Sequence, residues 1–205
     1  MVPIDEIGEE PAGSRWRPAL IALGAIALTA ALLYGILKPA PPTGIVPGAP
    51  APGFDLPVVT LEGQLEGSLS LDELKGSVVV LNFWWSGCDP CREEAPILDR
   101  TWREHRDEGV VVVGVDVERD SPAAAADFAR AFGMSYPIVR DTDGSLARSL
   151  RINDRFLPQT FFIDREGNLA QLHVGDVLTD GRSTTVLGPL TRAVLEKQIK
   201  AMLAD

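Results

Sequence analysis

Two continuous apolar runs dominate the pattern of hydrophobic and polar positions along the 205-residue chain, at 78–83 and 110–117. Both are rich in valine, and such runs are typical of strands that are buried on both faces of a sheet. Elsewhere the apolar positions follow a helical period. The segment 121–132 begins with a Ser-Pro pair, which supplies an N-cap and a first-turn proline for a helix. An amphipathic helix is predicted over 187–203.

Shorter elements complete the pattern. The sequence predicts strands at 54–60, 137–139, 160–164 and 169–174, and a short helix at 145–150. Pro57 marks the first of these as an edge strand, because proline cannot donate to a sheet ladder. The polar turn between the last two strands predicts an antiparallel hairpin. This order of elements predicts an α/β domain with a mixed central sheet that helices flank on both faces.

The N-terminal part of the chain has a different character. Residues 18–37 form an uncharged apolar run of about the length that spans a bilayer, with Trp16 and Tyr34 near its ends. Two arginines precede the run, which places the N-terminus in the cytoplasm. The expected organisation is a cytoplasmic tail at 1–17, a transmembrane anchor at 18–37, a Pro/Gly/Ala-rich linker at 38–53 and an extracytoplasmic domain at 54–205. A cleaved signal peptide is the alternative, although its apolar core is usually shorter.

Candidate chemistry is concentrated directly after the first buried strand. Cys88 and Cys91 are the only cysteines of the chain, and they form a CxxC motif. Pro90 suits the first turn of a helix, so Cys88 should lie at a helix N-terminus. The positive end of a helix stabilises a thiolate, which is the form that attacks disulfides. We therefore expect Cys88 to attack and Cys91 to resolve the mixed disulfide.

A zinc site or a purely structural disulfide would account for this motif less well. A zinc site needs four ligands, and His105 and His173 are the only histidines, far apart in the sequence. A merely structural disulfide would close a very short loop, which stabilises a fold little. We expect neither a metal nor a cofactor, and both histidines should be packed or surface residues. The net charge of −10 disfavours nucleic acid as a partner.

Four segments together resemble one known family. They are GAPAPGF at 48–54, LNFW at 81–84, CDPCREEAP at 88–96 and LPQTFFID at 157–164. The chain resembles the membrane-anchored TlpA/ResA-like thiol-disulfide oxidoreductases, which have a thioredoxin-like fold. The resemblance implies a protein that reduces disulfides of selected partners outside the cytoplasm, such as apocytochrome c. It also implies a thiol-electron donor in the membrane that reduces the protein again.

The resemblance also assigns roles to residues. Pro158 would be a cis-proline that faces the disulfide, and Leu157 would offer backbone groups to a bound peptide. Asp89 and Pro90 would line the same substrate groove, and Trp84 would be either a core residue or part of the groove wall. Glu94 matches the position of an active-site glutamate, which could raise the pKa of the resolving thiol and exchange a proton with it. The alternative for Glu94 is a solvated residue that serves only the helix dipole.

Three alternatives to this reductase stay open. An oxidase that donates its disulfide would need a strongly stabilised thiolate, which the acidic Asp89 and Glu94 disfavour. A peroxidase of the peroxiredoxin type would carry Thr where Trp85 stands, three residues before the first cysteine. A membrane-tethered binding module with vestigial redox activity is the third. The sequence assigns no role to Trp85 or to the loop at 176–188, and Gly87 should leave the surface around the nucleophile open.

Overall fold

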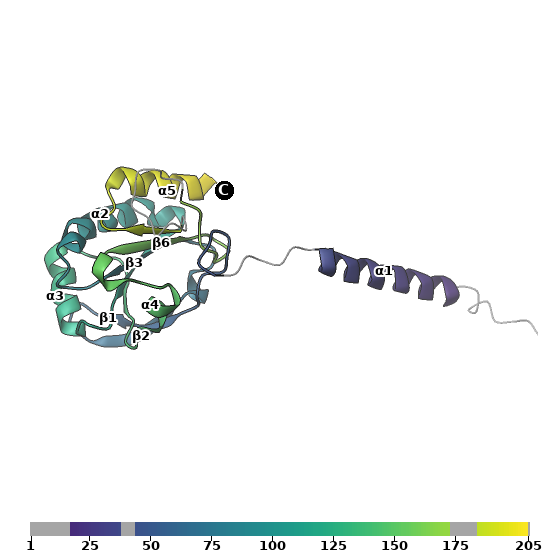
Figure 1. The fold of residues 1–205 in the computed structure, drawn as a ribbon, viewed down its shortest axis with the longest axis horizontal. Helices are drawn as coiled ribbons and strands as arrows, with labels where there is room; N and C mark the ends of the chain where they lie inside the picture. The colour runs from purple at the N-terminus through teal and green to yellow at the C-terminus, as the bar shows by residue number, and fades with distance from the viewer. Residues whose placement is uncertain (1–16, 38–43, 173–183, 205) are drawn as a thin grey trace, which may run out of the picture. The chain divides into compact units, whose positions relative to one another are not determined.

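The computed structural model describes residues 17–37, 44–172 and 184–204 (Figure 1). The chain forms two compact units, residues 1–40 and 41–205. The first contains helix α1 (Arg17–Leu37). Within the described parts of the chain, no helix reaches the length and apolar character that crossing a membrane requires. The predicted tail up to residue 16, the start of the predicted linker, His173 and most of the 176–188 loop lie outside the described residues.

The second unit is built on a mixed sheet whose strands follow the order β2-β1-β5-β4-β3-β6-β7. The strands are β1 (Asp55–Val59), β2 (Leu65–Ser70), β3 (Val78–Trp84), β4 (Val110–Asp116), β5 (Ile138–Arg140), β6 (Gln159–Ile163) and β7 (Thr185–Leu187). β3, β4 and β5 are parallel, and the other pairs are antiparallel. Every residue of β3 is buried, as the continuous apolar run predicts.

Helices flank this sheet. They are α2 (Asp89–His105), α3 (Pro122–Phe132), α4 (Ser145–Ser149) and α5 (Arg192–Ala204), with 3-10 turns η1 (Asp72–Leu74), η2 (Arg106–Glu108) and η3 (Asp154–Phe156). The predicted cap of α3 is confirmed, because the Ser121 hydroxyl accepts from the Ala124 N–H at 3.1 Å. α2 and α5 pack beside each other, and both contact the central strands (Figure 1).

The C-terminal elements differ from the prediction. On the side away from β3, the strand that pairs with β6 is β7. The described residues 169–172 of the predicted strand form no strand, but they contribute an isolated antiparallel bridge between Ile163 and Leu169 and a hydrogen bond from the Ala170 N–H to the Phe162 carbonyl at 2.8 Å. Leu169 instead bonds to the N-terminal segment: its N–H donates to the Ala49 carbonyl at 2.8 Å, and its carbonyl accepts from the Gly48 N–H at 2.8 Å. Since residues 185–187 form β7, the last helix begins at Arg192 rather than at 187.

The N-terminal boundary of the domain also needs correction. The second half of the predicted linker is folded, because Ile45 and Ala49 are buried in the domain and the Ala51 N–H donates to the Gly167 carbonyl at 2.9 Å. β1 is not an edge strand, since it lies between β2 and β5. Pro57 is accommodated beside a register shift of the β1–β2 ladder, where fewer ladder donors are needed.

Candidate active site

The two cysteines lie where the helix dipole can act on them. Cys88 is the N-cap of α2, with an extended backbone at φ −87° and ψ 105°, and its Sγ accepts from the Cys91 N–H at 3.2 Å. The two residues form a disulfide, with their Cα atoms 5.2 Å apart. Pro90 lies in the first turn, as predicted. A thiolate on Cys88 would therefore receive a backbone hydrogen bond and the positive end of the helix.

The two cysteines and the two residues between them differ in exposure to solvent. Both cysteines are buried, while Asp89 and Pro90 between them are exposed to solvent. Asp89 forms an exposed ion pair with Arg92 at 2.8 Å. The charges of this pair offset each other, so Arg92 supplies little net positive charge to the cysteines.

Glu94 lies one helical turn after Cys91, on the buried face of α2. It is only 1% exposed, so the alternative of a solvated dipole residue is wrong. Its two oxygens accept from the side-chain amide of Asn82 and from the Leu190 N–H, each at 2.8 Å. Asn82 also donates to the Thr160 hydroxyl at 2.9 Å. Burial raises the pKa of Glu94 to about 7, although both hydrogen bonds act to lower it.

A cis peptide bond joins Leu157 to Pro158, as the family resemblance implies. Both side chains are buried. β6 begins at the next residue, Gln159, which pairs with Phe83 near the end of β3. The cis-proline therefore lies at the same end of the sheet from which β3 leads to the cysteines. Its contact with a bound peptide stays a prediction.

A polar clamp fixes the loop before the nucleophile, and no pattern in the sequence indicated it. The Asp120 carboxylate accepts from the Ser86 N–H at 2.6 Å and from the Ser86 hydroxyl at 2.9 Å. The guanidinium of Arg140 donates to the carbonyls of Glu118 and Asp120 and pairs with the buried Asp116. Burial raises the pKa of Asp116 to about 8, with the Asp120 charge adding to this and Arg140 opposing it.

The two tryptophans of this loop have different environments. Trp84 is 1% exposed and stacks on Phe128 with ring centroids 4.7 Å apart, so of its two predicted environments it has that of a core residue and not that of a groove wall. Trp85 is partly exposed, and the guanidinium of Arg119 lies 5.0 Å from its ring centroid. Its ring lies so close to Gly87 that no side chain would fit there, and Gly87 itself is exposed, as the sequence suggested.

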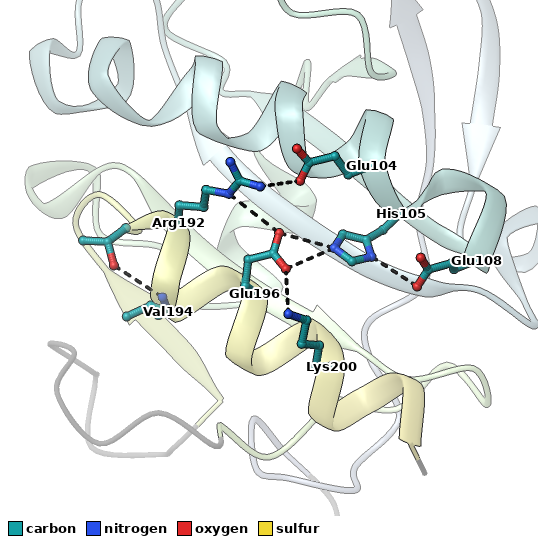
Figure 2. Close-up of polar contacts among 8 residues, drawn as sticks. Glu104, His105, Glu108, Arg192, Val194, Glu196 and Lys200 are labelled. Carbon is teal, nitrogen blue, oxygen red and sulfur yellow. Dashed lines mark hydrogen bonds and ion pairs between the residues drawn. The ribbon is translucent and has the colours of Figure 1, made fainter.

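His105 cannot share a metal with the cysteines. It ends α2, which Cys88 begins, and a helix of this length separates its ends by roughly 25 Å. Ligand atoms of Glu104, His105 and Glu196 do lie within 4.8 Å of one another. However, Arg192 pairs with Glu104 at 2.7 Å, and Lys200 pairs with Glu196 at 3.5 Å (Figure 2). These cations already balance the carboxylates, so the cluster is an ionic link between α2 and α5.

A thioredoxin-like α/β fold with a CxxC disulfide at a helix N-terminus defines a thiol-disulfide oxidoreductase. The chain belongs to the AhpC/TSA family, whose profile matches residues 47–172. It is 33% identical over 123 residues to the thiol-disulfide oxidoreductase ResA of Bacillus subtilis, covering 60% of this chain and 67% of that protein. It is 35% identical over 133 residues to the thioredoxin-like protein YneN of the same organism, covering 64% and 74%.

Solved structures agree with this assignment. A thiol:disulfide interchange protein of the thioredoxin family from Chlorobium tepidum superimposes with a TM-score of 0.59 at 25% identity, covering 81% of this chain and 99% of that one. The resemblance inferred from the sequence is thus confirmed at the level of family, fold and enzyme class.

Proposed function

We propose that the protein is an extracytoplasmic, membrane-anchored reductase of disulfides in selected partner proteins. The observation that carries this proposal is the buried Glu94 behind a CxxC pair at a helix N-terminus. Residues three apart on a helix are neighbours, so Glu94 follows Cys91 on the same buried face of α2. When Glu94 is ionised, its charge disfavours a thiolate at this position.

This electrostatic effect bears on the direction of the reaction. A strong disulfide oxidant owes its high potential to a stabilised reduced form, and a low thiolate pKa is one way to achieve this. Glu94 acts in the opposite sense, because it destabilises the thiolate and with it the reduced form. A protein with such a site gives its electrons away more readily, which favours the reductase over the disulfide-donating oxidase.

The reaction then proceeds in two exchange steps. The Cys88 thiolate attacks one sulfur of the partner disulfide, and the partner's other sulfur leaves as a thiolate. Glu94, with a pKa of about 7, accepts the proton of the Cys91 thiol. The Cys91 thiolate attacks Cys88 and releases the partner's first sulfur. The protein dithiol has become a disulfide, and the partner disulfide has become a dithiol.

The anchor belongs to this proposal for a thermodynamic reason. Compartments outside the cytosol are often oxidising, so a reductase there needs a continuing supply of electrons. Residues 18–37 would hold the domain near a thiol-electron donor in the membrane and raise the effective concentration of that encounter. Extraction of cell membranes with alkaline carbonate tests this part: the full chain should stay in the membrane fraction, and a chain without residues 18–37 should not.

Apocytochrome c is the partner that the family resemblance suggests. Its haem-attachment sequence is Cys-x-x-Cys-His, and the two cysteines must be reduced before haem is attached. The pre-reduced protein should reduce a peptide that carries this sequence as an internal disulfide, and Cys88→Ser should abolish the reaction. A wild-type protein that instead oxidises the reduced peptide would favour the oxidase. A protein that exchanges with neither form would favour the binding module.

A further inference from the structure

The most exposed large apolar side chain in the described part of the domain is Phe156, at 50% exposure. A single exposed apolar residue needs no explanation by itself, so its position and neighbours decide its meaning. Phe156 ends the turn η3 and directly precedes Leu157, whose bond to Pro158 is cis. The exposed ring therefore belongs to the loop at the active-site end of the sheet.

The turn that carries Phe156 is held by side chains from two other places. Asp154 accepts from the guanidinium of Arg119 at 2.5 Å. The side-chain amide of Gln159 donates to the Asn153 carbonyl at 2.6 Å. A turn fixed in this way presents its exposed ring without a large loss of conformational entropy on binding.

The same guanidinium reaches the cysteine loop. Arg119 lies over the ring of Trp85, 5.0 Å from its centroid, and Trp85 is three residues before Cys88. The ring lies so close over Gly87 that an added Cβ would be 2.3 Å from it. Arg119 thus connects the loop before the nucleophile to the turn before the cis-proline.

We propose that Trp85, Arg119 and Phe156 form a docking rim beside the disulfide, and that this rim binds an apolar or aromatic side chain next to the reactive cysteine of a partner polypeptide. The inference deepens the proposed function and rests on it. Aromatic rings offer large apolar contact area at a small entropy cost, and they are enriched where proteins bind one another. The rim is continuous with the Leu157–Pro158 loop, where the partner's backbone is expected to lie.

The charges of the rim favour an uncharged side chain. Arg119 is already paired with Asp154, so its guanidinium has little free charge to attract an acidic residue. Its planar face can still stack on an aromatic ring, as it does on Trp85. The partner residue we expect is therefore phenylalanine, tyrosine or leucine rather than aspartate or serine.

Two disulfide peptides that differ in one residue test the proposal. They carry either Phe or Ser next to the attacked cysteine, and the purified full chain reduces them under identical conditions. We expect kcat/KM to be about fivefold higher for the Phe peptide, and the preference to vanish in Phe156→Ala. Leu61→Ala is the matched control, because Leu61 is similarly exposed at 48% but lies in the turn between β1 and β2; it should keep the preference.

Several outcomes would overturn the rim. They are equal turnover of both peptides by the wild type, a preference that survives in Phe156→Ala, and a Phe156→Ala variant that loses turnover of both peptides equally. A wild type that reduces neither peptide would contradict the proposed function instead. In that case Cys91→Ser, which stops at the mixed disulfide, still measures the preference. The equilibrium constant for the mixed disulfide between Cys88 and each peptide, measured in competition with glutathione, should be larger for the Phe peptide. Equal constants for the two peptides would contradict the proposed rim.

Discussion

At the scale of single residues, the proposed mechanism depends on the charge state of Glu94. Its side chain has almost no contact with solvent, and its hydrogen-bond partners Asn82 and Leu190 offer N–H groups that do not titrate. Burial raises the pKa of Glu94 to about 7, so the group changes charge close to neutral pH. In the proposed mechanism it therefore accepts and returns the proton of the Cys91 thiol.

The same pKa predicts how stability depends on pH. In the unfolded chain Glu94 titrates near 4.5, and in the folded protein near 7, so the folded state binds the proton more tightly. Its contribution to stability is complete below pH 4.5 and is lost as the pH rises to about 7, by about 3 kcal/mol. Glu94→Gln lacks this loss. In urea unfolding of the oxidised proteins, the unfolding free energy of the variant should rise relative to that of the wild type across this pH range. A difference that does not change with pH would contradict the assignment.

Gly114 on β4 provides a second prediction at this scale. A Cβ there would lie 2.8 Å from Trp84 Nε1 and 3.1 Å from the ring of Tyr136. Gly114→Ala should cost about 1–3 kcal/mol of unfolding free energy, because buried rings cannot move aside freely. Gly53→Ala is the control, since nothing lies within 4 Å of its added Cβ. Equal unfolding midpoints in urea for the two variants would show that the core accommodates the methyl group.

Some site residues could be found from the sequence, and the reason is local. Cys88, Cys91 and Glu94 share one helix whose start was visible in the chain, and the family motif led to Pro158. Asp120 could not be found in this way, because its contact with Ser86 crosses 34 positions. The Leu190 N–H that binds Glu94 is 96 positions away, and any residue type supplies a backbone donor. The sequence left Trp84 open between core and groove wall, because its apolar environment depends on Phe128 of another helix.

At the scale of elements, the pairing of α2 with α5 supports the site. His105 at the end of α2 contacts Glu196 of α5 at 3.2 Å and Glu108 at 3.2 Å (Figure 2). α5 begins two residues after Leu190, whose N–H binds Glu94. A firmly docked α5 therefore also holds the hydrogen bond to the buried carboxyl.

This link should depend on pH. Burial acts to lower the pKa of His105, but hydrogen bonds to Glu108 and Glu196 and the charges of both raise it above 6.5. Its stabilising effect is thus present below pH 6.5 and is lost as the pH rises through the folded-state pKa. Glu196→Gln should cost about 1 kcal/mol more at pH 5.5 than at pH 8.5 in urea unfolding. The exposed Glu62→Gln serves as control, and equal costs at both pH values would refute the link.

The elements also show how far sequence patterns reach. β3, β4 and α3 were predicted almost to the residue, since a long apolar run or a Ser-Pro start fixes them locally. β7 was missed because three residues carry no period, and only pairing with β6 makes them a strand. The segment 45–53 was predicted to be a linker because its proline and alanine content suits a spacer. Its fold depends on contacts with Leu169 and Gly167, far along the chain.

At the scale of the whole molecule, the proposal joins a redox domain to a membrane tether. The domain is the unit at 41–205, which holds every residue of the redox site. The proposed anchor lies in the other unit, at 1–40. In the proposed arrangement the domain needs only a donor that reaches Cys88, and the tether keeps that donor close.

The reduction potential of the Cys88–Cys91 pair tests the central claim most directly. The full chain is equilibrated with defined thiol-disulfide buffers at pH 8, where Glu94 is ionised, and the fraction of free thiol is counted by alkylation. A reductase should have a potential, converted to pH 7, near or below about −270 mV. Glu94→Gln should move it by about 10–30 mV toward less negative values, while the exposed Glu93→Gln should leave it in place. A wild-type potential near about −120 mV on the same pH 7 scale would contradict the account and identify a donor of disulfides.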